Sequence, residues 1–202
     1  MPHIELSPSL PGISAAFAFR PETAVPLREL AHILLFESGR TTSLSSRDRE
    51  LIAAYVSSLN TCHFCQQSHG AAAAHHPGGS DDLVNAVCAN PRTADISPKL
   101  RALLAIAARV QADAKTVTPF LIQAACAEGA TDLEIHDTVL IAAAFCMYNR
   151  YVDGLATWQP REAPMYAQMG EHLANKGYRT TSTLADGKRS SFSNGETLGI
   201  TK

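Results

Sequence analysis

Residues 50–69 read ELIAAYVSSLNTCHFCQQSH, and the interpretation of the whole chain starts from this stretch. Apolar residues recur at helical spacing in its first half, and Asn60-Thr61 is a cap-like break. The preceding residues 45–48 carry a serine followed three positions later by a carboxylate, which is close to a capping box. The sequence therefore predicts one helix over about residues 46–59 and a second over about residues 62–76.

The second of these helices carries a Cys-x-x-Cys-x-x-x-His pattern. Spacings of three, four and seven residues put Cys62, Cys65 and His69 on one stripe of a helix. Cysteine acts as a nucleophile in its thiolate form, which a helix N-terminus and an adjacent base both favour. If the two helices pack antiparallel, Glu50 meets His69 and orients it or exchanges a proton with it. These four residues are the candidate catalytic residues.

Two other interpretations of the cysteine pair stay open. The candidate ligands for a zinc site are Cys62, Cys65, His69 and one of His63, His75 and His76. Zinc ligands usually lie on a turn and come as two compact pairs, so we expect no metal. The cysteines could instead be inert core thiols, although the polar residues 66–68 that follow them argue against this interpretation.

The remaining cysteines and two of the histidines are given structural roles. Cys88, Cys126 and Cys146 lie in apolar helical contexts and are expected to be buried small hydrophobic residues. His32 and His136 lie in amphipathic segments and are expected at the surface or at the edge of the core.

The rest of the chain also predicts helices and no strands, so the expected fold class is all-α. The further helices are expected at about residues 21–38, 81–89, 97–113, 119–128 and 131–152. A single helical domain should span residues 1–179, with an extended N-terminal arm over residues 1–21 that holds at most one short helical turn. The Ser/Thr/Gly-rich residues 180–202 are expected to form a tail.

A faint internal repetition supports a two-repeat architecture. Residues 45–54 and residues 131–140 both open a helix with a cap, continue with a charged turn and end in an apolar run. The longest strongly apolar run, residues 139–148, has about half the length that a membrane span needs, so we expect no membrane partner.

Composition narrows the function classes. The chain has 202 residues, enough for one well-buried domain, and a formal net charge of -2, which disfavours binding to nucleic acid. Only 18% of the residues are charged, below the usual quarter or so, which hints at surface buried in an oligomer. The N-terminal residues show no secretory signal, and five cysteines are an odd number for a disulfide framework. A cytoplasmic protein is expected.

The pattern Glu-x11-Cys-x-x-Cys-x-x-x-His on an Ala-rich helical pair resembles the alkylhydroperoxidase D-like (AhpD-like) branch of the carboxymuconolactone decarboxylase superfamily, above all its peroxidase-related members. The specific match covers residues 50–74, and a looser one extends over most of the chain except roughly the last twenty residues. The resemblance implies an all-helical fold assembled as trimers or hexamers. It also implies that Cys65 is the peroxidatic cysteine and Cys62 the resolving one, with Glu50 and His69 in a proton relay.

One position departs from the family pattern. The best-known members carry a histidine immediately before the second cysteine, where this chain has Phe64, and the nearest histidine is one step earlier at His63. One residue on a helix is a rotation of about 100°, so His63 is not assigned the missing role. The helix N-terminus by itself favours Cys62 as the thiolate, whereas the resemblance and the spacing to His69 favour Cys65.

The expected function is an antioxidant thiol peroxidase that reduces organic hydroperoxides through a Cys-x-x-Cys dithiol–disulfide cycle without a cofactor. A small-molecule or protein dithiol would reduce the pair after each turnover. The helix over residues 139–148 and the apolar surroundings of Tyr55 and Phe64 are expected to shape the pocket. The alternatives are a thiol–disulfide oxidoreductase that acts on a protein partner and, in a different class, a zinc-stabilised helical interaction module.

Overall fold

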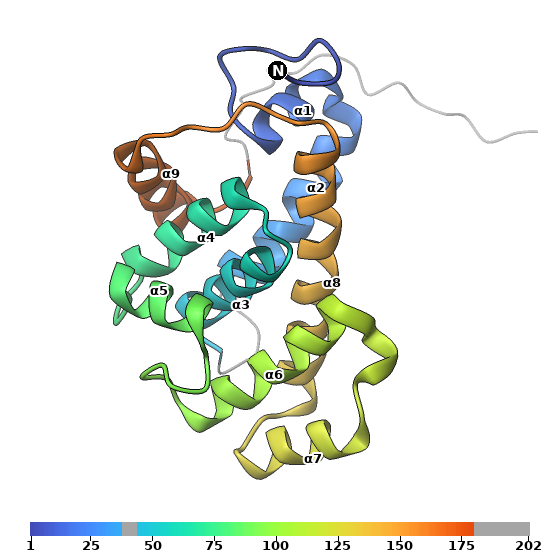
Figure 1. The fold of residues 1–202 in the computed structure, drawn as a ribbon, viewed down its shortest axis with the longest axis vertical. Helices are drawn as coiled ribbons and strands as arrows, with labels where there is room; N and C mark the ends of the chain where they lie inside the picture. Colours follow the sequence, from blue (N-terminus) through green and yellow to red (C-terminus); the bar gives the residue numbers. More distant parts are fainter. Residues whose placement is uncertain (38–43, 180–202) are drawn as a thin grey trace, which may run out of the picture.

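The computed structural model describes residues 1–37 and 44–179, and this part of the chain is built from helices without a β-strand (Figure 1). The α-helices are α1 (Ile13–Phe19), α2 (Pro21–Ala31), α3 (Ser46–Leu59), α4 (His63–His75), α5 (Asp81–Ala89), α6 (Pro98–Asp113), α7 (Pro119–Ala127), α8 (Asp132–Gly154) and α9 (Ala163–Lys176). A π-helical turn, η1 (His32–Phe36), continues α2, and a 3₁₀ turn, η2 (Ala114–Thr116), follows α6. The all-α fold class is confirmed.

The helix starts that depend on capping residues lie where the sequence predicts them. The Ser45 hydroxyl accepts a hydrogen bond from the Asp48 N–H at the start of α3. Ser97 caps α6 in the same way, ahead of a proline in the first turn. At α8, Thr131 and Glu134 form a complete capping box. These caps satisfy backbone donors that a helix start otherwise leaves unpaired.

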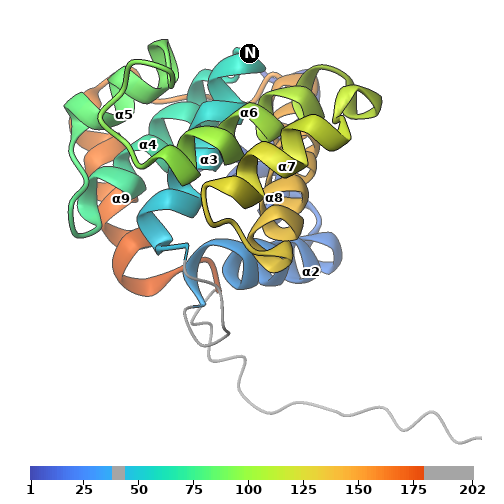
Figure 2. The ribbon, with the colours of Figure 1, turned by 90° about the horizontal axis from the view of Figure 1, so that it is seen from below.

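Helix α3 is the centre of the fold. It packs against α4, α6 and α8, and Leu51, Ile52 and Val56 on it are fully buried (Figures 1 and 2). Because apolar surface faces α3 from three sides, the helix is buried over most of its circumference. Its polar residue Glu50 is buried with the core, and α4 places His69 beside it.

Helix α9 lies on the other side of α4 from α3, and the sequence analysis placed no helix there (Figure 1). Its start has no side-chain cap, and only Tyr166 and Gly170 on it are buried. A β-carbon at Gly170 would lie 2.4 Å from the backbone of Ala71 in α4. The missing side chain therefore allows the two helices to approach closely, a packing requirement that periodicity does not reveal.

The N-terminal region also differs from the prediction. Residues 13–19 of the expected extended arm form α1, which buries Ala15, Ala16 and Phe17. The helix predicted over residues 21–38 changes to π-helical hydrogen bonding at His32 and ends at Phe36. The expected end of this helix near residue 38 and the expected tail over residues 180–202 lie outside the described residues.

The two segments with similar openings, at α3 and α8, pack against each other in the core. The two-repeat architecture is consistent with this arrangement, while assembly into an oligomer stays a prediction. Among the described residues, no helix is both long enough and apolar enough to cross a membrane.

Candidate active site

A tight turn between α3 and α4 positions the cysteines. Thr61 adopts a left-handed conformation with φ of 58°, which is uncommon for a residue other than glycine. The Cys62 N–H then donates to the Ser57 carbonyl at 3.0 Å, and Cys62 becomes the N-cap residue of α4. Cys65 follows in the first turn of that helix, where unpaired N–H groups and the positive end of the helix dipole favour an anion.

The two thiols are free and buried, and they belong to the same small core cluster. A hydrogen bond from the Cys62 thiol lowers the pKa of Cys65, against the opposing effect of burial, and the neighbouring His69 and a hydrogen bond with Asn149 lower this pKa further. The same thiol contact raises the pKa of Cys62, and burial adds to the rise. These opposite pKa shifts favour a thiolate at Cys65 over one at Cys62, while the peroxidatic and resolving roles stay predictions.

Glu50 and His69 meet across the α3–α4 hairpin. The carboxylate oxygen Oε2 of Glu50, a residue only 1% exposed, lies 2.8 Å from His69 Nδ1. A protonated Nδ1 that donates to this carboxylate leaves Nε2 of the imidazole as the nitrogen available for proton exchange. The Phe145 ring packs edge-on against the imidazole, with centroids 4.5 Å apart, and fixes its plane.

A third side chain, Tyr178, completes this group. Its hydroxyl donates to Glu50 Oε1 at 2.5 Å, and its oxygen lies 3.2 Å from His69 Nδ1. The Tyr178 ring is also stacked on the imidazole at an interplanar angle of 13°. Burial raises the pKa of Tyr178 well above its usual range, and the Glu50 carboxylate adds to this rise, so the hydroxyl stays a donor. Glu50, His69 and Tyr178 are hereafter called the relay.

Tyr178 is delivered by residues 177–179, a segment that we name the C-terminal strap. Gly177 has φ of 69°, and a β-carbon there would lie 2.6 Å from Nδ1 of His32. The Tyr178 N–H donates to this Nδ1 at 3.2 Å, and burial lowers the pKa of His32, which favours the neutral ring that such an acceptor requires. The expectation that His32 lies at the surface or the edge of the core is therefore wrong: the residue is buried and anchors the strap.

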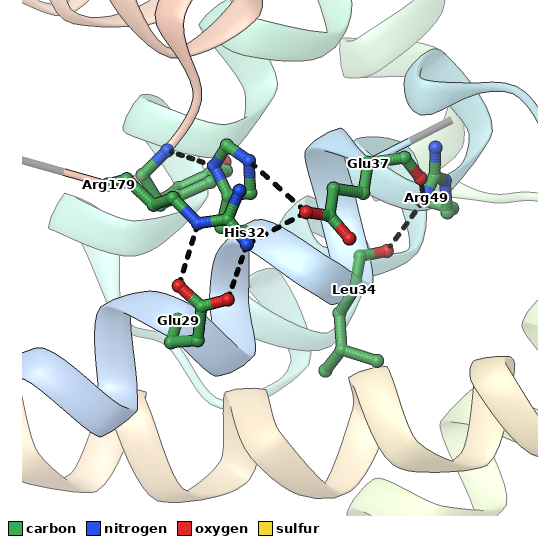
Figure 3. A network of polar contacts seen from close by, with 7 residues as sticks. Glu29, His32, Leu34, Glu37, Arg49 and Arg179 are labelled. Carbon is green, nitrogen blue, oxygen red and sulfur yellow. Dashed lines mark hydrogen bonds and ion pairs between the residues drawn. The ribbon is translucent and has the colours of Figure 1, made fainter. Parts of the chain in front are cut away.

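Ion pairs hold the end of the strap against α2 (Figure 3). Arg179 pairs with Glu29 through two hydrogen bonds and with Glu37 at 2.8 Å. Arg49 of α3 donates to the carbonyl oxygens of Leu34 and Glu37 at 3.2 and 3.0 Å and fastens the end of η1 to the helix that carries Glu50. The strap, η1 and α3 are thus linked through polar contacts.

Asn149 of α8 closes the site behind Cys65. Its amide nitrogen donates to the Ser57 hydroxyl at 3.0 Å, and its carbonyl oxygen accepts from Asn60 at 2.8 Å. The sequence analysis gave no role to Asn149 or to Tyr178. Asn149 is an amide in the mostly apolar α8, and this isolated polar residue is a sequence signal for a functional contact. Tyr178, by contrast, lies in no motif or spacing that links it to Glu50.

His63 and Phe64 face α9 rather than the relay. His63 is exposed and lies edge-on to Tyr166, with ring centroids 5.8 Å apart. Phe64 is buried against the same tyrosine and against Gly12, where a β-carbon would overlap its ring. The departure from the family pattern at these two positions therefore serves packing between α4, α9 and the N-terminal segment.

The other cysteines differ in burial, and one expectation fails. Cys88 and Cys146 are half-buried, but Cys126 is exposed, because α7 buries only Ala125 and leaves the opposite side of the helix uncovered. Apolar composition alone does not tell which side of a short helix packs. His136 is exposed, as expected for a surface histidine.

Cys65 and His69 lie in the wall of a cavity of about 920 Å³. Most of its other lining residues are apolar and come from α1, α2, α4, α8 and α9; they include Ile13, Phe17, Leu27, Phe64, Phe145 and Met169. Phe64 and the α8 residues line this cavity as predicted. Tyr55 does not, since it lies in a separate depression beside Arg92 and Arg101.

The structure thus combines a helical fold with a buried Cys-x-x-Cys pair, a Glu–His contact and an apolar cavity. The sequence profile of the Carboxymuconolactone decarboxylase family matches residues 27–109, which include α3, α4 and the candidate catalytic residues. Together with the solved structures described next, this match supports a relationship to the AhpD/carboxymuconolactone decarboxylase superfamily.

Three solved structures share the fold. An alkylhydroperoxidase AhpD core, an uncharacterized peroxidase-related protein from Ralstonia eutropha JMP134, has a TM-score of 0.70 and 25% identity, with 80% of this chain and 82% of that chain covered. An uncharacterized peroxidase-related protein from Silicibacter sp. TM1040 has a TM-score of 0.67 and 26% identity, with 76% of each chain covered. A protein of unknown function from Agrobacterium tumefaciens, at 22% identity, supports the fold alone, with a TM-score of 0.63 and coverage of 75% and 99%. No curated protein matches the chain significantly.

Proposed function

We propose that this protein is a cysteine-dependent peroxidase that reduces organic hydroperoxides, with Cys65 as the attacking residue and Cys62 as the resolving one. The observation that carries the proposal is the environment of Cys65. Its sulfur accepts a hydrogen bond from Cys62, lies close to His69 and Asn149, and opens on an apolar cavity. A lowered thiol pKa next to a histidine is what a cysteine nucleophile requires at neutral pH.

In the first step, the Cys65 thiolate attacks the terminal oxygen of the hydroperoxide. The S–O bond forms as the O–O bond breaks, so the sulfur is oxidised to a sulfenic acid and the peroxide is reduced to an alkoxide. The alkoxide takes a proton from His69, which had received it from the Cys65 thiol, and leaves as an alcohol. Glu50 and Tyr178 hold the imidazole in place through Nδ1 while Nε2 exchanges the proton.

In the second step, the Cys62 sulfur attacks the Cys65 sulfenic acid, and the hydroxyl group leaves as water together with the thiol proton of Cys62. The product is a Cys62–Cys65 disulfide. A dithiol of small-molecule or protein origin then reduces this disulfide by exchange and becomes a disulfide itself, which restores both thiols and completes a two-electron cycle.

Tyr178 acts in this scheme as a positioning residue. It contacts the other two members of the relay, and it supplies the second hydrogen bond to the Glu50 carboxylate, which is shielded from water. A carboxylate with both oxygens engaged keeps one orientation, and the tautomer of His69 follows from that orientation.

The intact mass of the reduced protein before and after one equivalent of an alkyl hydroperoxide tests the proposal. The Cys126→Ser variant is the starting material, because the exposed Cys126 thiol would otherwise be open to oxidation as well. The expected result is the loss of two hydrogens, located by peptide mapping to a Cys62–Cys65 disulfide, and consumption of peroxide when a dithiol is added. Survival of both thiols would overturn the proposal.

The same experiment separates the two alternatives. A thiol–disulfide oxidoreductase would form the disulfide with an oxidised partner protein but not with peroxide, and the burial of both cysteines does not favour contact with a partner. A zinc module would retain metal and keep its thiols, whereas the described residues hold no group of three or more metal-ligating side chains. Assembly as a trimer or hexamer and a place in the cytoplasm stay predictions.

A further inference from the structure

Arg28 of α2 lies in the wall of the Cys65 cavity without an acidic partner. It is half-buried, and its guanidinium carbon lies 4.8 Å from the centre of the Phe17 ring. Within residues 1–37 and 44–179, its side chain makes no hydrogen bond or ion pair. By contrast, Arg49 donates to two carbonyl oxygens and Arg179 pairs with two carboxylates. A partly desolvated cation without a partner is costly, so its place in a cavity wall calls for an explanation.

The other charged residues of the cavity wall have the same sign. Lys176 and Arg179 also line the cavity, and none of the described aspartates or glutamates does. Arg179 is neutralised by its pairs with Glu29 and Glu37, which leaves Arg28 as the half-buried cation that faces the cavity without a counter-charge among the described residues. A mostly apolar wall with one positive region complements a ligand that is apolar along its length and anionic at one end.

The size of the cavity points to a large ligand. At about 920 Å³ it is near the upper end of the roughly 300–1,000 Å³ that small-molecule pockets span. Hydrogen peroxide or a short alkyl hydroperoxide would fill only a small part of it and would bury little of the apolar surface that lines it. A long-chain ligand buries this surface and gains from the hydrophobic effect.

We infer that the cavity binds hydroperoxides of the fatty-acid class, with an apolar chain along the wall and a carboxylate held by Arg28. The inference rests on the proposed function for the peroxide end of the ligand, and on the cavity itself for the other end. Arg28 is suited to the carboxylate because its planar group donates two parallel hydrogen bonds, which are strong where water is excluded. Its stacking on Phe17 limits its motion before the ligand arrives.

Steady-state kinetics with a matched pair of substrates test the inference. A linoleic acid hydroperoxide and the methyl ester of the same hydroperoxide differ only in the charge of the head group. We expect the wild-type kcat/KM to favour the acid by about tenfold, as for one charge-assisted hydrogen-bonded contact. Arg28→Gln should reduce this ratio to near one, Arg28→Lys should retain part of it, and the control Arg92→Gln in the separate depression should keep the wild-type ratio.

Binding of unoxidised linoleic acid, measured by calorimetry against its methyl ester, decides the inference without turnover. The acid should bind the wild-type protein about tenfold more tightly than the ester does, and Arg28→Gln should remove the difference. Equal binding of acid and ester by the wild type, or an equal loss of both in Arg28→Gln, would overturn the inference. Failure of the proposed function would give a different result. The protein would then reduce no hydroperoxide, including tert-butyl hydroperoxide, but it would still bind the acid more tightly than the ester.

Discussion

The relay is built from two regions that are held in place in different ways. The α3–α4 hairpin supplies Glu50 and His69 from the buried core of the protein, next to a short turn. The C-terminal strap supplies Tyr178 from the surface, fastened by the partly exposed ion pairs of Arg179 and by one hydrogen bond to His32. Exposed ion pairs contribute little to stability and weaken with salt. In the proposed mechanism, the hairpin therefore provides the reacting groups, and the strap positions them through contacts that are easier to release.

The largest expected effect distinguishes the two cysteines of the hairpin. Cys65→Ser should lower peroxidase turnover by about 10³-fold or more, because the attacking sulfur is gone. Cys62→Ser should still consume one equivalent of hydroperoxide and then stop as the Cys65 sulfenic acid, which a sulfenic-acid-specific probe and mass spectrometry detect. If the serine variant at Cys62 rather than at Cys65 abolished the first reaction, the roles would be reversed.

Removal of the charge at Glu50 comes next in size. Glu50→Gln keeps the shape of the side chain but weakens its hold on the imidazole, and general acid–base catalysis of this kind contributes about 10²-fold or more. We expect kcat/KM for an alkyl hydroperoxide to fall by about 10²-fold while dithiol reduction of a preformed disulfide changes less. An equal loss in both half-reactions would show that the variant disturbs the fold.

A strap variant should have a smaller effect. Tyr178→Phe removes one hydroxyl and leaves the ring stacked on His69, so kcat/KM should fall by about tenfold, as for one hydrogen bond to a charged group. Tyr55→Phe on α3, outside the cavity, is the matched control. The measurement is the pH dependence of kcat/KM, because a purely structural role of Tyr178 would leave this profile unchanged. We expect the profile to shift along the pH axis in Tyr178→Phe and not in Tyr55→Phe. A loss as large as that of Glu50→Gln would remove the distinction between hairpin and strap.

The lowered pKa of Cys65 predicts a measurable pH dependence at the hairpin. The thiolate is present above this pKa, so alkylation of Cys65 by iodoacetamide should stay fast at neutral pH and slow down as the pH falls through it. Asn149→Ala removes one hydrogen bond to the sulfur and should shift the alkylation profile of Cys65 to higher pH, with a rate at pH 7 lower by a few-fold. Peptide mapping should find Cys62 unmodified under the same conditions, and preferential alkylation of Cys62 would contradict the assignment.

The smallest effect concerns the anchor of the strap. Burial lowers the pKa of His32 in the folded protein below its pKa of about 6.5 in the unfolded chain. Below about pH 6.5 the unfolded chain therefore binds a proton at His32 more readily than the folded protein does. Stability should therefore decrease as the pH falls below about 6.5, and His32→Gln, which cannot be protonated, should show less of this decrease. Thermal unfolding between pH 5 and pH 8 measures both. An unchanged pH dependence in the variant would show that other groups dominate.

How well each region could be predicted from the sequence depends on whether its contacts join residues that are near or far apart in the chain. Helices α3, α6 and α8 are marked by serine or threonine caps, and the hairpin brings Glu50 to His69 through spacing and one short turn, so sequence reasoning reaches them. Tyr178 meets Glu50 across most of the chain, and no periodicity reports such a contact. Helix α9 lacks a side-chain cap and packs through Gly170, whose role is the absence of a side chain.

The buried state of single residues was harder to predict than the helices themselves. Cys126 lies in an apolar segment and is exposed, while His32 lies in an amphipathic one and is buried. In both cases the hydrophobic pattern predicts the helix, but it does not predict which neighbouring segment packs over the residue. That neighbour is the strap for His32, and Cys126 has none among the described residues.

The position of Tyr178 near the end of the described chain has a consequence for biosynthesis. Translation proceeds from the N-terminus, and domains fold as their residues emerge. The thiol pair and the α3–α4 hairpin are therefore synthesised long before the strap, and the second hydrogen bond to Glu50 forms only when the strap docks. A nascent chain therefore carries its cysteines before it can complete the relay, which requires residues 177–179 to have emerged and docked.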